Sequence, residues 1–114
     1  MISWGQLTST GLSNWDCRVF YGKSGNTVHL QGWVRCDALN GSEGICGGTL
    51  PSVYYPRGAD YQFEVDERPT LTQNKTRTLE AYITGTGTIG VKGRVPYHSY
   101  VSVDAQFICA STST

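Results

Sequence analysis

The sequence predicts an all-β domain, either an antiparallel β-sandwich or a small β-barrel. Apolar residues alternate with polar ones along most of the chain and do not recur at helical spacing. Gly, Pro, Asn or Asp interrupts the alternation about every eight to twelve residues, which is typical of short strands joined by turns. At 114 residues the chain has room for one domain, residues 1–114, with one hydrophobic core.

The alternation predicts strands but no helix. The expected strands, in chain order, are residues 16–21, 26–36, 45–50, 60–66, 78–84, 88–92 and 97–109. The turns between them contain residues that tolerate positive φ or close a local hydrogen bond, as in Asn40-Gly41-Ser42 and Gly85-Thr86-Gly87.

The last expected strand shows one apolar and one polar face. Its apolar face comprises Val101, Val103, Ala105 and Phe107, and its polar face comprises Ser102, Asp104 and Gln106. The strand at 26–36 repeats this pattern with Val28, Leu30 and Val34 on the core side. Trp33 then falls on the polar face, where it either lies under a loop or serves as an oligomer interface or ligand platform.

Composition and charge argue against nucleic-acid and membrane partners. Charged residues make up 16% of the chain, against about 25% in an average soluble protein. Thirteen Thr and ten Ser predict a hydroxyl-rich exterior. The nine basic and nine acidic residues balance, and the basic ones are scattered, so we expect no nucleic-acid partner. No apolar run has the length of a membrane span, and the first fifteen residues lack the pattern of a signal peptide, so no membrane insertion is expected.

Four cysteines are present, at positions 17, 36, 46 and 109, with no C-x-x-C spacing and only two His residues. A structural zinc site is therefore not expected. Disulfides and thiols both remain open. Cys17, Cys36 and Cys109 share strand parity with apolar residues, which favours buried thiols that pack as small hydrophobes.

No catalytic constellation is evident, and we expect neither an enzyme nor a cofactor. Glu64 and Asp66 lie two residues apart on one strand face, roughly 7 Å from one another, a separation that can serve glycoside hydrolysis. However, their neighbours Tyr61, Phe63 and Val65 form the apolar face, so the two carboxylates belong to the solvent face. His29 and His98 have no nucleophile motif to join them.

An ordered set of short motifs runs through the chain. It comprises Asn14-Trp15, Leu30-Gln31-Gly32-Trp33-Val34, Thr49-Leu50-Pro51, Tyr55-Pro56 with Arg57 after the proline, a Gly-rich hairpin carrying Ile89 and Val91, and a closing strand from Tyr100 to Phe107. This order resembles the distal domains of bacteriophage tail fibres and the head domains of siphophage receptor-binding proteins. The four cysteines are not part of that pattern, and Arg57 follows the proline that it precedes in the family.

The resemblance implies a homotrimer with one small β-barrel or sandwich in each subunit. It also implies saccharide recognition in crevices near subunit boundaries. The domain is then expected to be the C-terminal tip of a fibre, to be made in the host cytoplasm and to end up at the tail tip of the virion. A reducing cytoplasm agrees with thiols in place of disulfides.

Saccharide recognition needs a flat ring to cover the apolar face of a sugar and planar polar groups to bind its hydroxyls. Two loop clusters offer both. The candidates are Tyr54, Tyr55, Arg57 and Asp60 after Leu50-Pro51, and Arg94, Tyr97, His98 and Tyr100 leading into the final strand, with Trp33 as a possible platform. The alternative is that these side chains pack the barrel ends or a trimer interface.

The expected function is therefore non-catalytic attachment of a virion to a saccharide on the host surface. Two other functions fit the same features. One is a purely structural virion fibre or decoration domain, and the other is a carbohydrate-binding module from a secreted bacterial protein.

Overall fold

A computed structural model describes residues 4–8, 14–58 and 60–109 of the chain. Eight strands form one sheet in which all neighbours are antiparallel, in the order β1-β2-β3-β8-β5-β6-β7-β4. The strands are β1 (Gly5–Thr8), β2 (Trp15–Ser24), β3 (Thr27–Cys36), β4 (Ser42–Thr49), β5 (Tyr61–Arg68), β6 (Arg77–Ile83), β7 (Thr88–Val95) and β8 (Tyr100–Ile108). One 3₁₀ turn, η1 (Ser52–Tyr54), follows β4. The predicted all-β class is confirmed.

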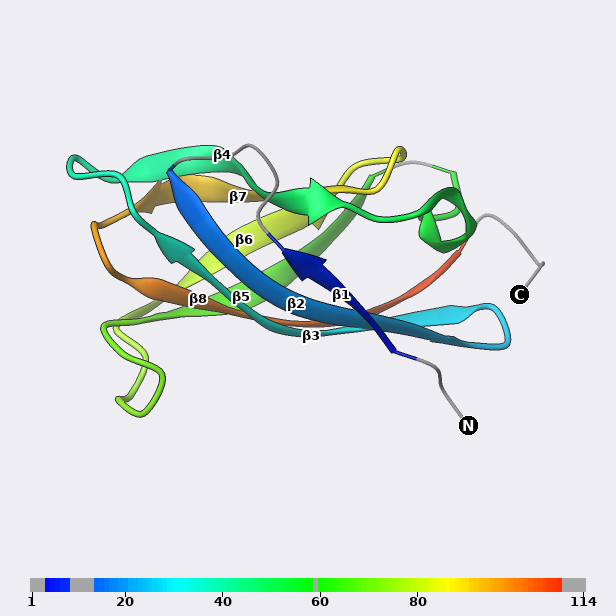
Figure 1. Cartoon of the computed structure of the whole chain (residues 1–114), viewed down its shortest axis with the longest axis horizontal. Helices are drawn as coiled ribbons and strands as arrows, with labels where there is room; N and C mark the ends of the chain where they lie inside the picture. Colours follow the sequence, from blue (N-terminus) through cyan, green and yellow to red (C-terminus); the bar gives the residue numbers. More distant parts are fainter. Residues whose placement is uncertain (1–3, 9–13, 59, 110–114) are drawn as a thin grey trace.

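The sheet curls until its two edges face each other. Edge strand β4 lies against β2 and β1, above them in the view of Figure 1, so the eight strands enclose one core as an open barrel. The molecule is elongated, with extents of 41 × 25 × 21 Å. Curling in this way covers both edge strands and limits the unpaired backbone that they expose.

The two halves of the sheet, β1-β2-β3-β8 and β5-β6-β7-β4, are joined by a short ladder. Only Asp66, Glu67 and Arg68 of β5 pair with β8, opposite Ser102, Val101 and Tyr100. By contrast, β2 and β3 pair from Trp15↔Cys36 to Ser24↔Thr27. Beyond Asp66 the strands β5 and β8 diverge, which Figure 1 shows toward its right-hand side.

The predicted strand faces are confirmed. The side chains expected to form the core face of β3 are fully buried, and Val101, Val103, Ala105 and Phe107 of β8 are buried as well. Trp33 is half-buried on the outer face. The interior also takes Leu50, Ile83, Ile89 and Val95 from the other half of the sheet. Burial of apolar area on this scale is the main force that stabilises the barrel.

Several strand bounds differ from the sequence prediction. Strand β1 was not predicted, because four residues with one buried leucine give too short a pattern to recognise. Strand β2 continues to Ser24, because the hairpin turn is only Gly25-Asn26. Strand β8 begins at Tyr100 rather than at residue 97, since Ser99 N donates to Pro96 O at 3.1 Å and closes a turn there. Strands β5 and β7 extend to Arg68 and Val95.

One carboxylate lies inside the ladder that joins the halves. Glu67 is only 5% exposed and faces the core side of β5. Its Oε1 accepts from Arg77 Nε at 3.0 Å, and its Oε2 accepts from Thr76 Oγ1 at 2.9 Å. The buried charge is therefore paired and hydrogen-bonded, as its burial requires.

All four cysteines are buried thiols. Cys17 on β2 and Cys46 on β4 meet across the side of the barrel where the sheet edges face each other, and a Cβ built at Gly47 would lie 3.5 Å from Cys17 Sγ. Cys17 Sγ donates to Leu7 O at 3.8 Å and Cys46 Sγ to Ile89 O at 3.9 Å. Burial raises the pKa of both thiols because it disfavours the thiolate. The expectation of thiols acting as small hydrophobes is confirmed.

Gly32 is required by the close approach of β2 to β3. Its φ is +148°, and a Cβ there would clash with Arg18 O and lie 2.7 Å from Val19 Cα. We predict that Gly32→Ala lowers the free energy of unfolding by about 3 kcal/mol, because backbone on both strands must move. Gly85→Ala is the control, since its Cβ would lie 3.7 Å from the nearest atom at an ordinary φ. Urea unfolding of both variants tests this, and equal stability would contradict it.

The burial of the thiols predicts their reactivity. In guanidinium without reductant, iodoacetamide should modify four cysteines, because no disulfide holds them. In the folded protein at pH 8, Cys17 and Cys46 should react far more slowly, since burial limits access and their raised pKa keeps the thiolate scarce. Intact-mass spectrometry counts the adducts, and fewer than four in the unfolded chain would show that a disulfide had formed.

Candidate functional site

The divergence of β5 from β8 opens the wall of the barrel at one end. Continued past Asp66↔Ser102, the register would place Tyr61 opposite Phe107. No backbone pairing occurs there, and the gap is bridged by side chains, with the rings of Tyr61 and Phe107 5.4 Å apart and those of Tyr61 and Phe63 stacked at 5.8 Å. Large aromatic rings thus fill the space that a backbone ladder leaves.

The loop after η1 occupies the edge of β8 that β5 has left. Pro56 forms a bridge with Cys109, and Arg57 N donates to Ile108 O at 3.0 Å. This backbone pairing fixes where the Arg57 side chain begins. Between this loop, the start of β5 and the end of β8 lies a hollow of about 430 Å³.

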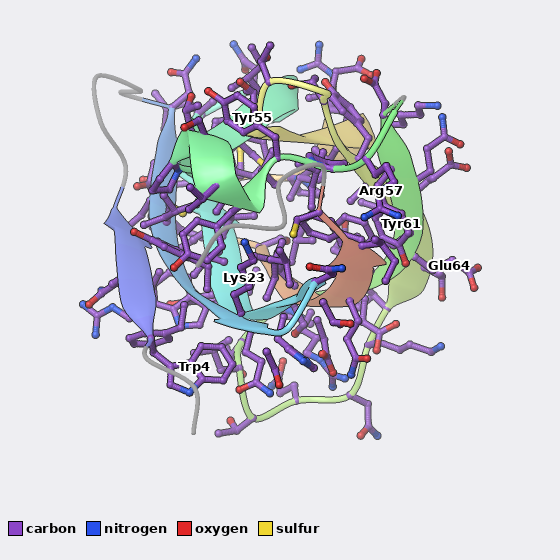
Figure 2. All side chains as sticks on the ribbon, turned by 90° about the vertical axis from the view of Figure 1, so that its right-hand side faces the viewer. Trp4, Lys23, Tyr55, Arg57, Tyr61 and Glu64 are labelled. Atoms are coloured by element: carbon purple, nitrogen blue, oxygen red, sulfur yellow. The ribbon has the colours of Figure 1, made fainter. Side chains whose placement is uncertain are left out.

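We call this space the Arg57 hollow. It is lined by Pro56, Arg57, Asp60, Tyr61, Phe107 and Ile108. Figure 2 looks onto this end of the barrel and shows Arg57 and Tyr61 next to one another, with Tyr55 and Lys23 away from them. Most of the lining is apolar, and Ile108 is 47% exposed. Two opposite charges, Arg57 and Asp60, provide its polar groups.

The two charged side chains are positioned differently. Asp60 Oδ1 accepts from Gly85 N at 2.9 Å, so the β6–β7 turn holds the carboxylate in place. The Arg57 side chain is exposed, so its guanidinium N–H groups can donate hydrogen bonds to a ligand. Only its backbone is fixed, by the hydrogen bond to β8. A carboxylate and a guanidinium beside an aromatic ring match the chemistry that a sugar with several hydroxyls requires.

The structure separates the first sequence-predicted cluster into two pairs. Arg57 and Asp60 line the hollow, whereas Tyr54 and Tyr55 pack against other residues. The ring of Tyr54 meets that of Tyr21 edge to face at 4.8 Å, and Tyr55 covers Gly87, where a Cβ would lie 2.7 Å from the Tyr55 ring. These contacts indicate that Tyr54 and Tyr55 pack within the fold.

The second cluster lies at the opposite end of the barrel. His98 N donates to Cys36 O, the end of β3 that is far from Arg57, so roughly 25 Å of strand separates the two clusters. Arg94 Nη1 donates to Asn40 O at 2.7 Å and to Gly41 O at 3.1 Å, which ties the β3–β4 loop to β7. The two clusters therefore do not form one site.

Tyr97 and His98 form a small aromatic feature of their own. Their rings stack at 3.7 Å, and His98 has a φ of +66°. A hollow of about 350 Å³ there is lined by Arg35, Pro69, Thr70, His98 and Tyr100. The Arg35 guanidinium is engaged with Asp37 at 2.8 Å and Asp16 at 3.4 Å, and its hydrogen bond to Asp37 raises its pKa.

Trp33 is partly covered by other side chains of the same chain. Its ring meets Tyr100 edge to face at 5.1 Å, and the guanidinium of Arg18 lies 5.8 Å from the ring centroid. These contacts come from the neighbouring strands β2 and β8. A tryptophan on the outer face of this sheet thus has intramolecular partners, so its position alone does not require a second subunit.

Sequence reasoning missed four of the six residues that line the Arg57 hollow, namely Pro56 in the loop and three strand residues. Tyr61, Phe107 and Ile108 were assigned to strands with ordinary inward and outward faces, and their alternation is indeed that of strands. Their position around the hollow follows from the divergence of β5 from β8, which alternation does not encode.

Within the described residues, no group of His, Cys, Asp or Glu is arranged to hold a metal ion. Glu64 is exposed, and Asp66 forms ion pairs with Arg68 Nη2 at 3.2 Å and Lys75 Nζ at 3.7 Å. These pairs give Asp66 a structural role on the outer face of β5. In the part of the chain that the structure describes, no helix has the length and hydropathy to cross a membrane.

Comparison with known proteins supports the fold. No protein-family model matches the sequence, and no curated protein matches it. Among solved structures, the chain is similar to the receptor binding protein (gp15) of Listeria phage PSA, with a TM-score of 0.72 and 15% sequence identity. The match covers 96% of this chain and 66% of that protein, so the chain spans just under two thirds of its length. The resemblance to phage receptor-binding proteins is thus confirmed for the fold.

Proposed function

We propose that this chain is the host-binding head domain of a bacteriophage receptor-binding protein and that it binds a cell-surface saccharide in the Arg57 hollow. The fold supports the first part, because nearly the whole chain superimposes on part of a phage receptor binding protein. A fold hosts many functions, so the second part depends on the chemistry of the hollow.

One observation carries the choice of ligand. In the Arg57 hollow an aromatic ring, Tyr61, lies beside the exposed Arg57 guanidinium and the Asp60 carboxylate, which Gly85 N holds in place. The ring can cover the apolar face of a pyranose while Arg57 and Asp60 bind its hydroxyls. The ligand is bound and released unchanged, because the hollow offers no pair of carboxylates on opposite sides of a glycosidic bond.

In this proposal the domain is the C-terminal tip of a tail fibre, carried on the virion after synthesis in the host cytoplasm. It acts as a homotrimer with host cell-surface glycan as its partner and needs no cofactor. A purely structural fibre or decoration domain has the same fold but binds no glycan. A carbohydrate-binding module of a secreted protein binds glycan but is not mounted on a virion.

Binding by the Arg57 hollow predicts a local mutational effect. Arg57→Ala and Tyr61→Ala should weaken binding to the host cell-wall polysaccharide at least tenfold, about 1.4 kcal/mol. Arg57→Ala should leave the melting temperature nearly unchanged, since this side chain is exposed. Binding is measured by biolayer interferometry on immobilised polysaccharide, and melting by circular dichroism.

The matched comparison for Arg57→Ala lies at the other end of the barrel. His98→Asn removes the imidazole and keeps a residue that tolerates the positive φ of this position. Binding should be unaffected by His98→Asn. A tenfold loss with His98→Asn and none with Arg57→Ala would move the site to the Tyr97–His98 end. An unmodified protein that binds no host polysaccharide would favour the purely structural function.

The trimer is a second, separate prediction. We expect light scattering at micromolar concentration to give about three times the subunit mass of 12.5 kDa. The resemblance to fibre tips supports threefold symmetry, and the half-buried Trp33 with the 40% exposed Phe20 gives the outer face of β2 and β3 apolar area to bury. A stable monomer would contradict this prediction and would leave the glycan-binding proposal open.

A further inference from the structure

We propose that the saccharide extends beyond the Arg57 hollow, over Asp60, into a second hollow on the outer face of β5, β6 and β7. The ligand is then an uncharged chain of several sugar units rather than a terminal monosaccharide. This inference rests on the proposed function, because it extends the same site.

The second hollow, which we call the Tyr82 hollow, has a volume of about 440 Å³. It is lined by Glu43, Gly44, Asp60, Gln62, Tyr82, Val91, Lys92 and Gly93. Two of the lining residues are glycines, whose lack of a side chain leaves part of this space open. Gly44, at a φ of +94°, faces open space, since a Cβ built there would have no atom within 4 Å.

Tyr82 provides a flat ring on the outer face of the sheet. Its side chain lies across Gly90 of β7, where a Cβ would clash with Cζ and the hydroxyl of Tyr82 and lie 2.8 Å from its Cε2. Only a glycine at position 90 lets the ring lie down on the strand in this way. A half-buried ring that rests on backbone is a rigid platform for the apolar face of a sugar.

Polar groups surround this ring in a fixed network. Lys92 Nζ lies 3.2 Å from Glu80 Oε1. With the Gln62 amide oriented to satisfy its neighbours, its nitrogen donates to Glu80 Oε1 at 2.8 Å and its oxygen accepts from Lys92 Nζ at 2.9 Å. Three side chains from β5, β6 and β7 thus hold one another in place, and two of them line the hollow.

The charges of the Tyr82 hollow select against anionic ligands. Glu43 and Asp60 are exposed carboxylates, and the one ammonium, on Lys92, is paired with Glu80. Within the Tyr82 hollow, a polymer that carries phosphate or uronic acid would be repelled by these carboxylates. Carboxylate and amide groups accept hydrogen bonds from sugar hydroxyls, so a neutral chain fits better.

Asp60 is the link between the two hollows, because it lines both. It stands immediately before β5, where Tyr61 and Gln62 point to opposite sides of the sheet. A chain that leaves the Arg57 hollow over this rim reaches Gln62 and Tyr82 next. The hydrogen bond from Gly85 N keeps the shared carboxylate in position for both parts.

Chain length is the variable that tests the inference. A glycan array of neutral oligosaccharides identifies the best-bound series, and isothermal titration then measures its members from one to six units. Affinity should rise at least tenfold between the shortest member that binds and the longer ones. Gln62→Ala and Tyr82→Ala should remove this gain and leave the affinity for the shortest member unchanged. Gln62→Ala should fold normally even if Tyr82→Ala does not, because the Gln62 side chain is exposed.

Glu64→Ala is the matched control for Gln62→Ala. Glu64 is exposed on the same face of β5, two residues along, and it does not line the hollow; Figure 2 shows it pointing away from the barrel. Glu64→Ala should leave the affinity unchanged for oligosaccharides of every length.

The outcomes separate the two proposals. If Arg57→Ala weakens every oligosaccharide but affinity does not rise with length, the site ends at Asp60 and this inference is wrong while the proposed function stands. If anionic oligosaccharides bind better than neutral ones, the inference is also wrong. If no oligosaccharide binds, or Arg57→Ala has no effect on any, the proposed function fails and the inference with it.

Discussion

A ladder of three residue pairs holds the two halves of this barrel together on one side. Asp66, Glu67 and Arg68 of β5 meet Tyr100, Val101 and Ser102 of β8, and the carboxylate at the centre of the ladder is buried and paired with Arg77. The opposite side is closed by packing between β4 and β2, where Cys17 meets Gly47. Because strands twist, two strands that pair over so short a length separate beyond it, and the barrel opens at that end.

The opening between β5 and β8 provides a place for a ligand-binding site. Elsewhere one face of each strand packs in the core and cannot contact a ligand. Along β3 and β8 the alternation of buried and outward side chains leaves little room for a cleft. At the open end, the half-buried ring of Tyr61 packs against the buried ring of Phe107, and the loop through Arg57 completes the rim. Asp60 stands at the start of β5 and lines both this hollow and the one on the outer face of β5, β6 and β7.

Alternation in the sequence was sufficient to predict the fold class, the core faces of β3 and β8, and the buried thiols. It failed for β1, which is too short, and at the start of β8, where a turn at 96–99 replaces the expected first residues. For the site, residue chemistry pointed to Arg57 and Asp60, and both line the hollow. The sequence could not show that Tyr55 packs inside the fold while Tyr61 lines the hollow. Tyr55 packs because its ring covers Gly87, and Tyr61 lines the hollow because β5 and β8 separate beside it. These positions depend on how strands far apart in the sequence pair, and the local alternation of apolar and polar residues carries no information about that pairing.

The central claim is that a saccharide binds at the open end of the barrel. The most direct test is a ¹H–¹⁵N NMR titration of the whole chain with a neutral fragment of the host cell-wall polysaccharide. We expect the amides of Arg57, Asp60, Tyr61, Phe107 and Ile108 to shift first and most. Shifts confined to Tyr97, His98 and Tyr100, or to the outer face of β2 and β3, would contradict it.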